Sequence, residues 1–257
     1  MAVGHDDFDR AARWIAAARR IVVLTGAGIS TDSGIPDFRG PQGLWTRNPE
    51  AEKQSNIEYY LADREVRIGA WKARLAHPAW EAKPNAGHRA IVALERQGRL
   101  HALITQNIDE LHQRAGNDPA RVVEVHGTVH RVMCWNCGRR SPMAETLQRI
   151  RAGEDDPSCN DCGGILKSDT ISFGQQLLPA VIERALRAAA ECDLLLAVGS
   201  TLAVYPVASA VPIARDASAR VVIVNGAPTE MDEMADVVLR GNISEILPRI
   251  VGPLPLD

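Results

Sequence analysis

The chain has 257 residues, of which 46% are hydrophobic and 24% are charged, so it can bury one full core or one large and one small core. Its formal net charge of −3 and its isoelectric point of about 6.2 argue against a generic nucleic-acid binder, and we expect no specific nucleic-acid partner. The sequence has no long apolar run and its start lacks the profile of a signal peptide, so we expect a cytoplasmic protein with no membrane partner.

Short apolar runs that predict strands alternate along the chain with stretches of helical periodicity. The predicted strands are 21–25, 101–105, 122–125, 194–198 and 220–224. The predicted helices are 7–19, 86–97, 108–115, 179–190 and 203–216. This alternation is typical of an α/β fold with a doubly wound, mostly parallel sheet, in which ligands bind at the carboxyl ends of the strands.

Two stretches interrupt the alternation. Residues 41–85 are rich in aromatic and charged side chains, and residues 130–170 hold four of the five cysteines. We therefore expect a single domain with two lobes. The large lobe would consist of residues 1–40, 86–129 and 171–257, and the two insertions would form a smaller lobe packed beside the sheet.

The strand at 21–25 runs directly into a glycine-rich loop. Gly26 and Gly28 allow a tight turn and a close approach to a ligand, and the N–H groups of the next turn could bind phosphate oxygens. The next glycine is Gly34, so the loop departs from the G-x-G-x-x-G pattern and makes an ordinary hydride-transferring dehydrogenase less expected. Taken alone, the loop could also be a plain strand-to-helix turn.

Three further polar groups follow predicted strand ends. Residues 105–109 (TQNID) could bind a carboxamide or a ribose, although Asp109 could instead be a charge at a helix N-terminus. His126 follows the strand 122–125, where it could be a general base or an ordinary structural histidine. Residues 199–201 (GST) could hold phosphate or ribose hydroxyl groups, or could simply cap a helix.

The smaller lobe contains two C-x-x-C pairs, and each is followed by a glycine. The four cysteines are Cys134, Cys137, Cys159 and Cys162. The spacing between the pairs is just beyond that expected of a tetrahedral zinc ribbon, and four sulfurs leave no open position on the metal. We therefore expect one structural Zn2+ ion. A pair of disulfides or redox dithiols is the alternative, which a cytosolic composition and a single remaining Cys192 disfavour.

Taken in order, these motifs resemble the sirtuin family of NAD-dependent protein deacylases, and most closely its bacterial members. The motifs are GAGIS at 26–30, GIPDFRG at 34–40, TQNID at 105–109, HG at 126–127, the cysteine pairs, FG at 173–174, GST at 199–201 and VN at 224–225. They cover nearly the whole chain. The resemblance implies one catalytic domain, with a Rossmann-like large lobe that binds NAD as a co-substrate and a small lobe made of a helical part and a zinc ribbon.

The resemblance also implies roles for single residues. His126 would be the general base and Asn107 a second catalytic residue, and Asp109 would accept a hydrogen bond from the nicotinamide carboxamide. The residues expected to bind NAD are Gly26, Ala27, Gly28, Ile29, Ser30, Asp37, Phe38, Arg39, Trp45, Gln106, Asn107, Ile108, Asp109, Gly199, Ser200, Thr201, Asn225, Gly226, Ala227 and Ile243.

The implied reaction consumes NAD. In the family's mechanism the acyl carbonyl oxygen of a modified lysine attacks the anomeric carbon of the nicotinamide ribose and expels nicotinamide. A base then deprotonates a ribose hydroxyl, which attacks the alkylimidate, and water completes the formation of free lysine and O-acyl-ADP-ribose. The implied partners are therefore acylated-lysine proteins, with deacetylation the expected activity.

The resemblance further implies a peptide-binding strand and an acyl pocket. Ser172, Phe173 and Gly174 would pair with the backbone of the substrate. Trp71 and Arg74 stand where some sirtuins have a Tyr-x-x-Arg pair that grips acidic acyl groups. They could favour a larger apolar acyl chain, or Arg74 could form an ion pair within the protein.

Two other functions stay open on the sequence. The same pocket could support mono-ADP-ribosyl transfer or NAD hydrolysis, in which a side chain or water intercepts the ribosyl group. A non-catalytic binding module could use the zinc knuckles and the basic residues Arg139 and Arg140. The set of Asn107, Asp109 and His126 argues against a pure binding module. We expect the protein to be a monomer.

Overall fold

The computed structural model describes residues 5–37, 53 and 55–252, and its larger lobe is built on a parallel sheet. The strand order is β3-β2-β1-β7-β8-β9, and all neighbouring strands run parallel. The strands are β1 (Ile21–Thr25), β2 (Leu100–Thr105), β3 (Val122–Glu124), β7 (Leu194–Val198), β8 (Arg220–Val224) and β9 (Val237–Leu239). The order reverses between β1 and β7, which is where sheets of this kind bind ligands.

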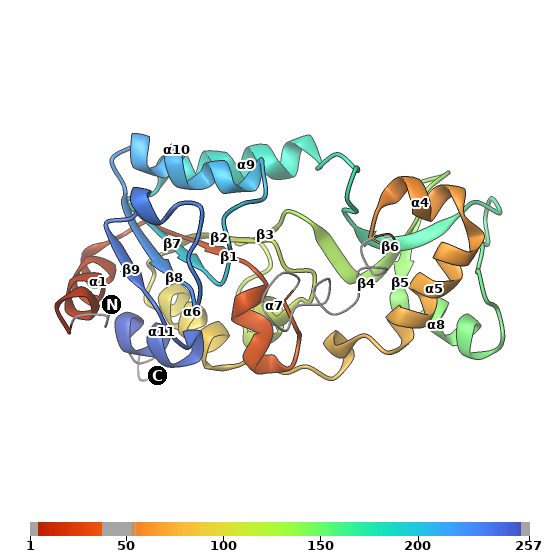
Figure 1. Ribbon diagram of the computed structural model, residues 1–257, viewed down its shortest axis with the longest axis horizontal. Coiled ribbons are helices and arrows are strands. Elements are labelled where there is room, and N and C mark those ends of the chain that lie inside the picture. The colour runs from red at the N-terminus through yellow and green to blue at the C-terminus, as the bar shows by residue number, and fades with distance from the viewer. Residues whose placement is uncertain (1–4, 38–52, 54, 253–257) are drawn as a thin grey trace.

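Helices cover both faces of this sheet (Figure 1). One face packs on α1 (His5–Ala17), α6 (Ala86–Arg96) and α11 (Ile243–Val251), and the other on α9 (Pro179–Glu191) and α10 (Ala210–Asp216). Strand side chains alternate between the two cores, so that Val23 faces the first and Val22 the second. The predicted doubly wound α/β fold is therefore confirmed. None of the helices in the described part of the chain could span a membrane.

The smaller lobe lies at the end of the molecule away from α1 and α11 (Figure 1). It has an antiparallel sheet of β4 (Gly127–Cys134), β5 (Arg140–Pro142) and β6 (Leu166–Thr170), in the order β5-β4-β6. Among the described residues its helices are α4 (Ile57–Ala62), α5 (Arg64–Leu75) and α8 (Met143–Arg151). Trp71 and Met143 are among the residues that form its separate core. The boundary expected between residues 129 and 130 falls inside β4.

Two predicted helices differ from the structure. The helix expected at 108–115 is α7 (Leu111–Ala115), because Glu110 takes a left-handed conformation with φ 56° that a helix cannot contain. The helix expected at 203–216 begins only at Ala210. Pro212 has no N–H group to donate, so it fits in the first turn of α10 and not in the middle of a longer helix.

The remaining elements are short. Four 3-10 helices complete the part of the chain that the structure describes, namely η1 (Ala27–Ser33), η2 (Pro78–Trp80), η3 (Val207–Ser209) and η4 (Asp232–Met234). Of these, η1 follows β1 directly and carries the glycine-rich motif to the carboxyl end of the sheet.

Candidate active site

The glycines at the switch point pack against one another. A Cβ atom on Gly28 would lie 2.8 Å from the Cα of Gly199, and one on Gly199 would lie 2.4 Å from the nitrogen of Ile29. The Gly26 nitrogen donates to the Val198 carbonyl over 3.0 Å, and the Gly28 nitrogen donates to the Gly199 carbonyl over 2.8 Å. The glycines thus join the ends of β1 and β7. These two N–H groups are therefore already bonded to protein, and phosphate binding by the N–H groups of the next turn stays a prediction.

A buried polar cluster lies beside this junction. Ser30 donates a 2.7 Å hydrogen bond to Asp109 Oδ2, and Asn107 Nδ2 donates to Ser30 Oγ over 3.1 Å. All three residues are buried, with Ser30 1%, Asn107 8% and Asp109 4% exposed. Burial raises the pKa of Asp109, although hydrogen bonds from Leu111 and Ser30 oppose this shift. The Leu111 nitrogen donates to Asp109 Oδ1, so Asp109 also has the helix N-terminal role that the sequence left open.

Gln106 and Ser200 meet at the same end of the sheet. Gln106 Nε2 donates to Ser200 Oγ over 2.9 Å, and Ser200 Oγ also accepts from the Leu202 nitrogen. No helix begins at Leu202, so Ser200 holds a turn instead of capping a helix. The hydroxyl therefore links the segment after β2 to the segment after β7, on either side of β1.

Other residues expected to bind NAD lie around the ends of β1 and β8. Asn225 follows β8 and is held by its Nδ2 hydrogen bond to the Ala227 carbonyl, whereas Gly226 and Ala227 are exposed. Ile243 begins α11 and belongs to the core. Ala27, Ile108 and Asp37 are half-buried, and Thr201 is exposed. Phe38, Arg39 and Trp45 lie outside the described residues.

His126 lies between β3 and β4, and its hydrogen bond fixes the tautomer of the ring. Nδ1 lies 2.9 Å from the Gln106 carbonyl oxygen, which can only accept, so Nδ1 carries the proton and Nε2 is the basic nitrogen. Burial lowers the pKa of His126, and the bond to Gln106 partly opposes this shift. The ring is therefore neutral near pH 7 and can accept a proton at Nε2.

Sequence reasoning missed two residues that support the cluster. His130 Nε2 donates to the Asp109 carbonyl over 3.1 Å, and its ring contacts Trp80 edge-on. Asn85 Nδ2 donates to the Ile29 carbonyl over 2.7 Å and so ties the N-terminus of α6 to η1. The signal for Asn85 was its place as a helix-capping residue before α6, and no local pattern marks His130.

The segment expected to bind peptide is partly paired within the protein. The Phe173 nitrogen donates to the Ser55 carbonyl, and the Phe173 carbonyl accepts from the Ile57 nitrogen. Both backbone groups of Ser172 bond to Gln175. These backbone groups are therefore engaged within the protein, and pairing of residues 172–174 with a substrate strand stays a prediction. The Phe173 side chain is 43% exposed.

Trp71 and Arg74 lie in the core of the small lobe. Trp71 is 0% exposed, and the Arg74 guanidinium lies 4.9 Å from the centroid of its ring and 5.5 Å from that of Tyr60. Arg74 Nη2 donates to Ser168 Oγ over 3.0 Å. Burial lowers the pKa of Arg74. These contacts favour a structural role for Arg74, whose guanidinium is held by two aromatic rings and a hydroxyl and not by an ion pair within the described part of the chain. Contact of Trp71 and Arg74 with an acyl group stays a prediction.

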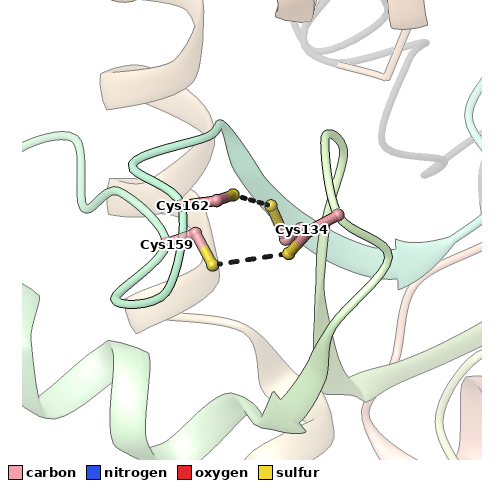
Figure 2. Close-up of side chains that lie close together, drawn as sticks. Cys134, Cys159 and Cys162 are labelled. Carbon is pink, nitrogen blue, oxygen red and sulfur yellow. Dashed lines mark hydrogen bonds between the residues drawn. The ribbon is translucent and has the colours of Figure 1, made fainter.

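The four cysteines of the small lobe converge on one point (Figure 2). Their sulfur atoms all lie within 4.8 Å of one another, with 3.5 Å between Cys134 and Cys162 and 3.8 Å between Cys137 and Cys159. A disulfide would need about 2.05 Å, so the four cysteines are not joined as disulfides in this structure. Tetrahedral Zn–S bonds of about 2.3 Å place sulfurs about 3.8 Å apart, so the cluster fits one zinc ion.

Comparisons with known proteins agree with this geometry. The model of the Sir2 family matches residues 26–206. NAD-dependent protein deacetylase 2 of Streptomyces coelicolor is 49% identical over 234 residues, which cover 91% of this chain and 97% of the relative.

Two solved structures are similar over almost their whole length. One, from work on the mechanism and regulation of Sir2 enzymes, has a TM-score of 0.87 and 39% identity and covers 96% of this chain and 97% of its own. The other, a Sir2 protein with a deacetylated peptide and 3'-O-acetyl ADP-ribose, has a TM-score of 0.87 and 32% identity and covers 95% of this chain and 96% of its own.

Proposed function

This chain belongs to the Sir2 family, and we propose on that premise that it is an NAD-dependent protein-lysine deacylase, with deacetylation as its main activity. The observation that carries the proposal is the buried cluster of Ser30, Asn107 and Asp109 at the switch point, with His126 beside it. Relatives named as NAD-dependent protein deacetylases match the chain over nearly its full length. NAD is a co-substrate here, and the products are nicotinamide, free lysine and O-acyl-ADP-ribose.

The cluster provides the groups that nicotinamide needs. Asp109 Oδ2 already accepts from Ser30, and a carboxylate oxygen has further acceptor capacity for a carboxamide N–H. Asn107 Nδ2 has a second hydrogen that could reach the carboxamide oxygen. Because these side chains are buried, their hydrogen bonds act in a low-dielectric site and hold the leaving group with little reorganisation.

His126 supplies the base for the second stage. Once the acyl oxygen has attacked the anomeric carbon and nicotinamide has left, Nε2 of His126 would take a proton from a ribose hydroxyl. That hydroxyl then attacks the alkylimidate. The bond from Nδ1 to the Gln106 carbonyl stabilises the imidazolium that forms, because it remains a donor in both protonation states.

The zinc site has a structural role in this proposal. Four thiolates from Cys134, Cys137, Cys159 and Cys162 would hold the ion and leave no position for water or substrate. Cys134 and Cys159 belong to the same core as Trp71, so the ion would fix the packing of α5 against β4 and β6.

The two rival functions receive unequal support. Arg139 pairs with Asp161 and Arg140 with Asp169, so the basic residues of the zinc ribbon are neutralised, which weakens the case for a binding module. Mono-ADP-ribosyl transfer or NAD hydrolysis would use the same pocket, and only the reaction products distinguish them from deacylation.

We further propose that the protein is a monomer that acts in the cytoplasm on acylated-lysine proteins. The near-neutral composition suggests no specific nucleic-acid partner.

The test is mass spectrometry of NAD turnover on lysine peptides that carry acetyl, butyryl, lipoyl or succinyl groups, with His126→Ala as the control. Deacylated peptide, nicotinamide and O-acyl-ADP-ribose in equal amounts, all lost in the variant, would support the proposal. Release of nicotinamide while the acyl groups stay on the peptides, with ADP-ribose gained by protein or lost to water, would replace it with the transferase or hydrolase alternative.

A further inference from the structure

A chain of buried hydrogen bonds lies behind the nicotinamide cluster. Thr25 and Thr105 are the last residues of β1 and β2 and face each other in register, so their hydroxyl groups meet at 2.9 Å. His112 Nε2, on α7, lies 3.0 Å from Thr25 Oγ1. The Asn107 nitrogen donates to Thr105 Oγ1 over 3.1 Å. The three side chains of this chain are buried, with Thr25 0%, Thr105 2% and His112 1% exposed.

The directions of these bonds follow from one another. Thr105 Oγ1 accepts from both the Asn107 nitrogen and the Thr25 hydroxyl, so the Thr25 proton is committed to Thr105. Thr25 Oγ1 can then only accept from His112, which requires a proton on His112 Nε2. His112 is therefore the Nε2–H tautomer, and the chain runs in one direction from its ring through Thr25 to Thr105.

The surroundings of His112 support a neutral ring with a fixed orientation. Its ring centroid lies 4.9 Å from that of His88, which is also buried. Burial holds the pKa of His112 well below its ordinary value, and the neighbouring His88 adds to this shift. The ring is therefore uncharged at neutral pH and can donate only from Nε2. Its position is tied to the cluster from the other side, because the adjacent Leu111 nitrogen binds Asp109.

We propose that His112 is a positioning residue of the nicotinamide pocket, which acts through the hydroxyl groups of Thr25 and Thr105 to hold the backbone of Asn107. Asn107 has its side chain on Ser30, so a shift of its backbone would move the amide away from the geometry that nicotinamide requires. This inference rests on the proposed function of the Asn107 cluster. It assigns a role in NAD recognition to three residues that are at most 2% exposed and would act through Asn107.

The experiment compares two variants of Thr25 with a variant of His112. Thr25→Val keeps the shape and removes the hydroxyl, Thr25→Ser keeps the hydroxyl, and His112→Phe keeps the ring and removes the donor. We expect Thr25→Val and His112→Phe to lower kcat/KM for NAD by about tenfold to a hundredfold, because small misplacements of a binding group have effects of that order. Thr25→Ser should stay within about threefold of the parent, and the KM for the acetylated peptide should not change.

Loss of stability is separated from loss of positioning by a fourth variant. Val222→Ala removes two methyl groups from the core of β8, away from the pocket, and lowers Tm without touching the hydrogen-bond chain. A purely structural role for His112 predicts that all the damaging variants follow Tm alone. If Thr25→Val and His112→Phe keep kcat/KM for NAD at the parent level after allowance for Tm, or if Thr25→Ser is as damaging as Thr25→Val, the inference is wrong.

Failure of the proposed function is distinguishable from failure of this inference. A parent protein that turns over none of the acylated peptides would contradict the deacylase, and calorimetric titration with NAD would then replace turnover. Weaker NAD binding by Thr25→Val and His112→Phe, with Thr25→Ser like the parent, would still support His112 as a positioning residue. Equal binding by all would reject it. NMR of 15N-labelled histidine provides a second check, because a proton on Nδ1 of His112 in the parent would also reject the inference.

Discussion

The basic nitrogen of His126 is defined by a single backbone contact. Its Nδ1 donates to Gln106, so Nε2 is free to accept a proton, and burial lowers the pKa of the ring below its ordinary value of about 6.5. A base works only when deprotonated, so activity should be lost as the pH falls through this lowered pKa. We expect the acid limb of the kcat/KM profile to lie below pH 6.5, and pH-rate measurements on the acetylated peptide would check it. A limb at or above 6.5 would contradict the burial argument.

Asp109 is a second titrating group that could contribute to the acid limb, and the variant Asp109→Asn separates its contribution from that of His126. Asp109 has its pKa raised by burial and must stay ionised to accept from both Ser30 and the Leu111 nitrogen. Asp109→Asn keeps one acceptor oxygen and loses one of these bonds. Hydrogen bonds to charged groups are worth about 1.5–3 kcal/mol, so we expect kcat/KM for NAD to fall by about tenfold to a hundredfold. An acid limb that persists in Asp109→Asn would belong to His126, and unchanged NAD kinetics would remove Asp109 from the pocket.

At the scale of elements, the junction between η1 and the end of β7 is the most tightly constrained part of the site. Gly199 has φ +64°, and an added Cβ would lie 2.4 Å from the Ile29 nitrogen. We expect Gly199→Ala to lower the free energy of unfolding by about 2–4 kcal/mol, from backbone strain plus overpacking, and to weaken NAD binding. Chemical denaturation and calorimetry would measure both effects.

The matched control for that variant is a glycine with the same backbone and no neighbours. Gly98 has φ +71°, and nothing lies within 4 Å of an added Cβ. Gly98→Ala should therefore cost only about 1 kcal/mol of unfolding free energy and leave NAD binding unchanged. Equal losses in the two variants would mean that the contact with Ile29 is not important.

The zinc ribbon and the helices of the small lobe depend on the same core. Cys134 and Cys159 pack with Trp71, Met143 and Leu147, so removal of the ion would leave four free thiols beside this small core. We expect chelation to unfold the small lobe and abolish activity, although the metal does no chemistry. Hydrogen exchange should show lost protection in β4 and β6 and retained protection in β1 and β7. Cys192 lies outside the cluster, so the control variant Cys192→Ser should keep the metal. Full activity in protein verified to be metal-free would refute the structural role of the ion.

At the scale of the whole molecule, the sequence predicted what local patterns encode. Strands such as Leu194–Val198 are buried on both faces and therefore read as continuous apolar runs, and the cysteine spacing marks a zinc ribbon. β9 (Val237–Leu239) was missed, and α11 was missed although its pattern is amphipathic. The hydrogen-bond chain from His112 to Thr105 could not be predicted, because it joins three segments only after the sheet has formed.

Buried neutral histidines link the fold of the whole molecule to pH. His88 is 0% exposed, and burial, with a smaller contribution from Arg89, lowers its pKa to about 4. In the unfolded chain the pKa of this histidine is about 6.5, so unfolding between pH 6.5 and pH 4 takes up a proton. The free energy of unfolding therefore falls by about 1.4 kcal/mol for each pH unit below 6.5 in this range. Denaturant titrations across this range should show a smaller slope in His88→Gln, by about one proton. Equal slopes would show that His88 is protonated in the folded protein as readily as in the unfolded chain.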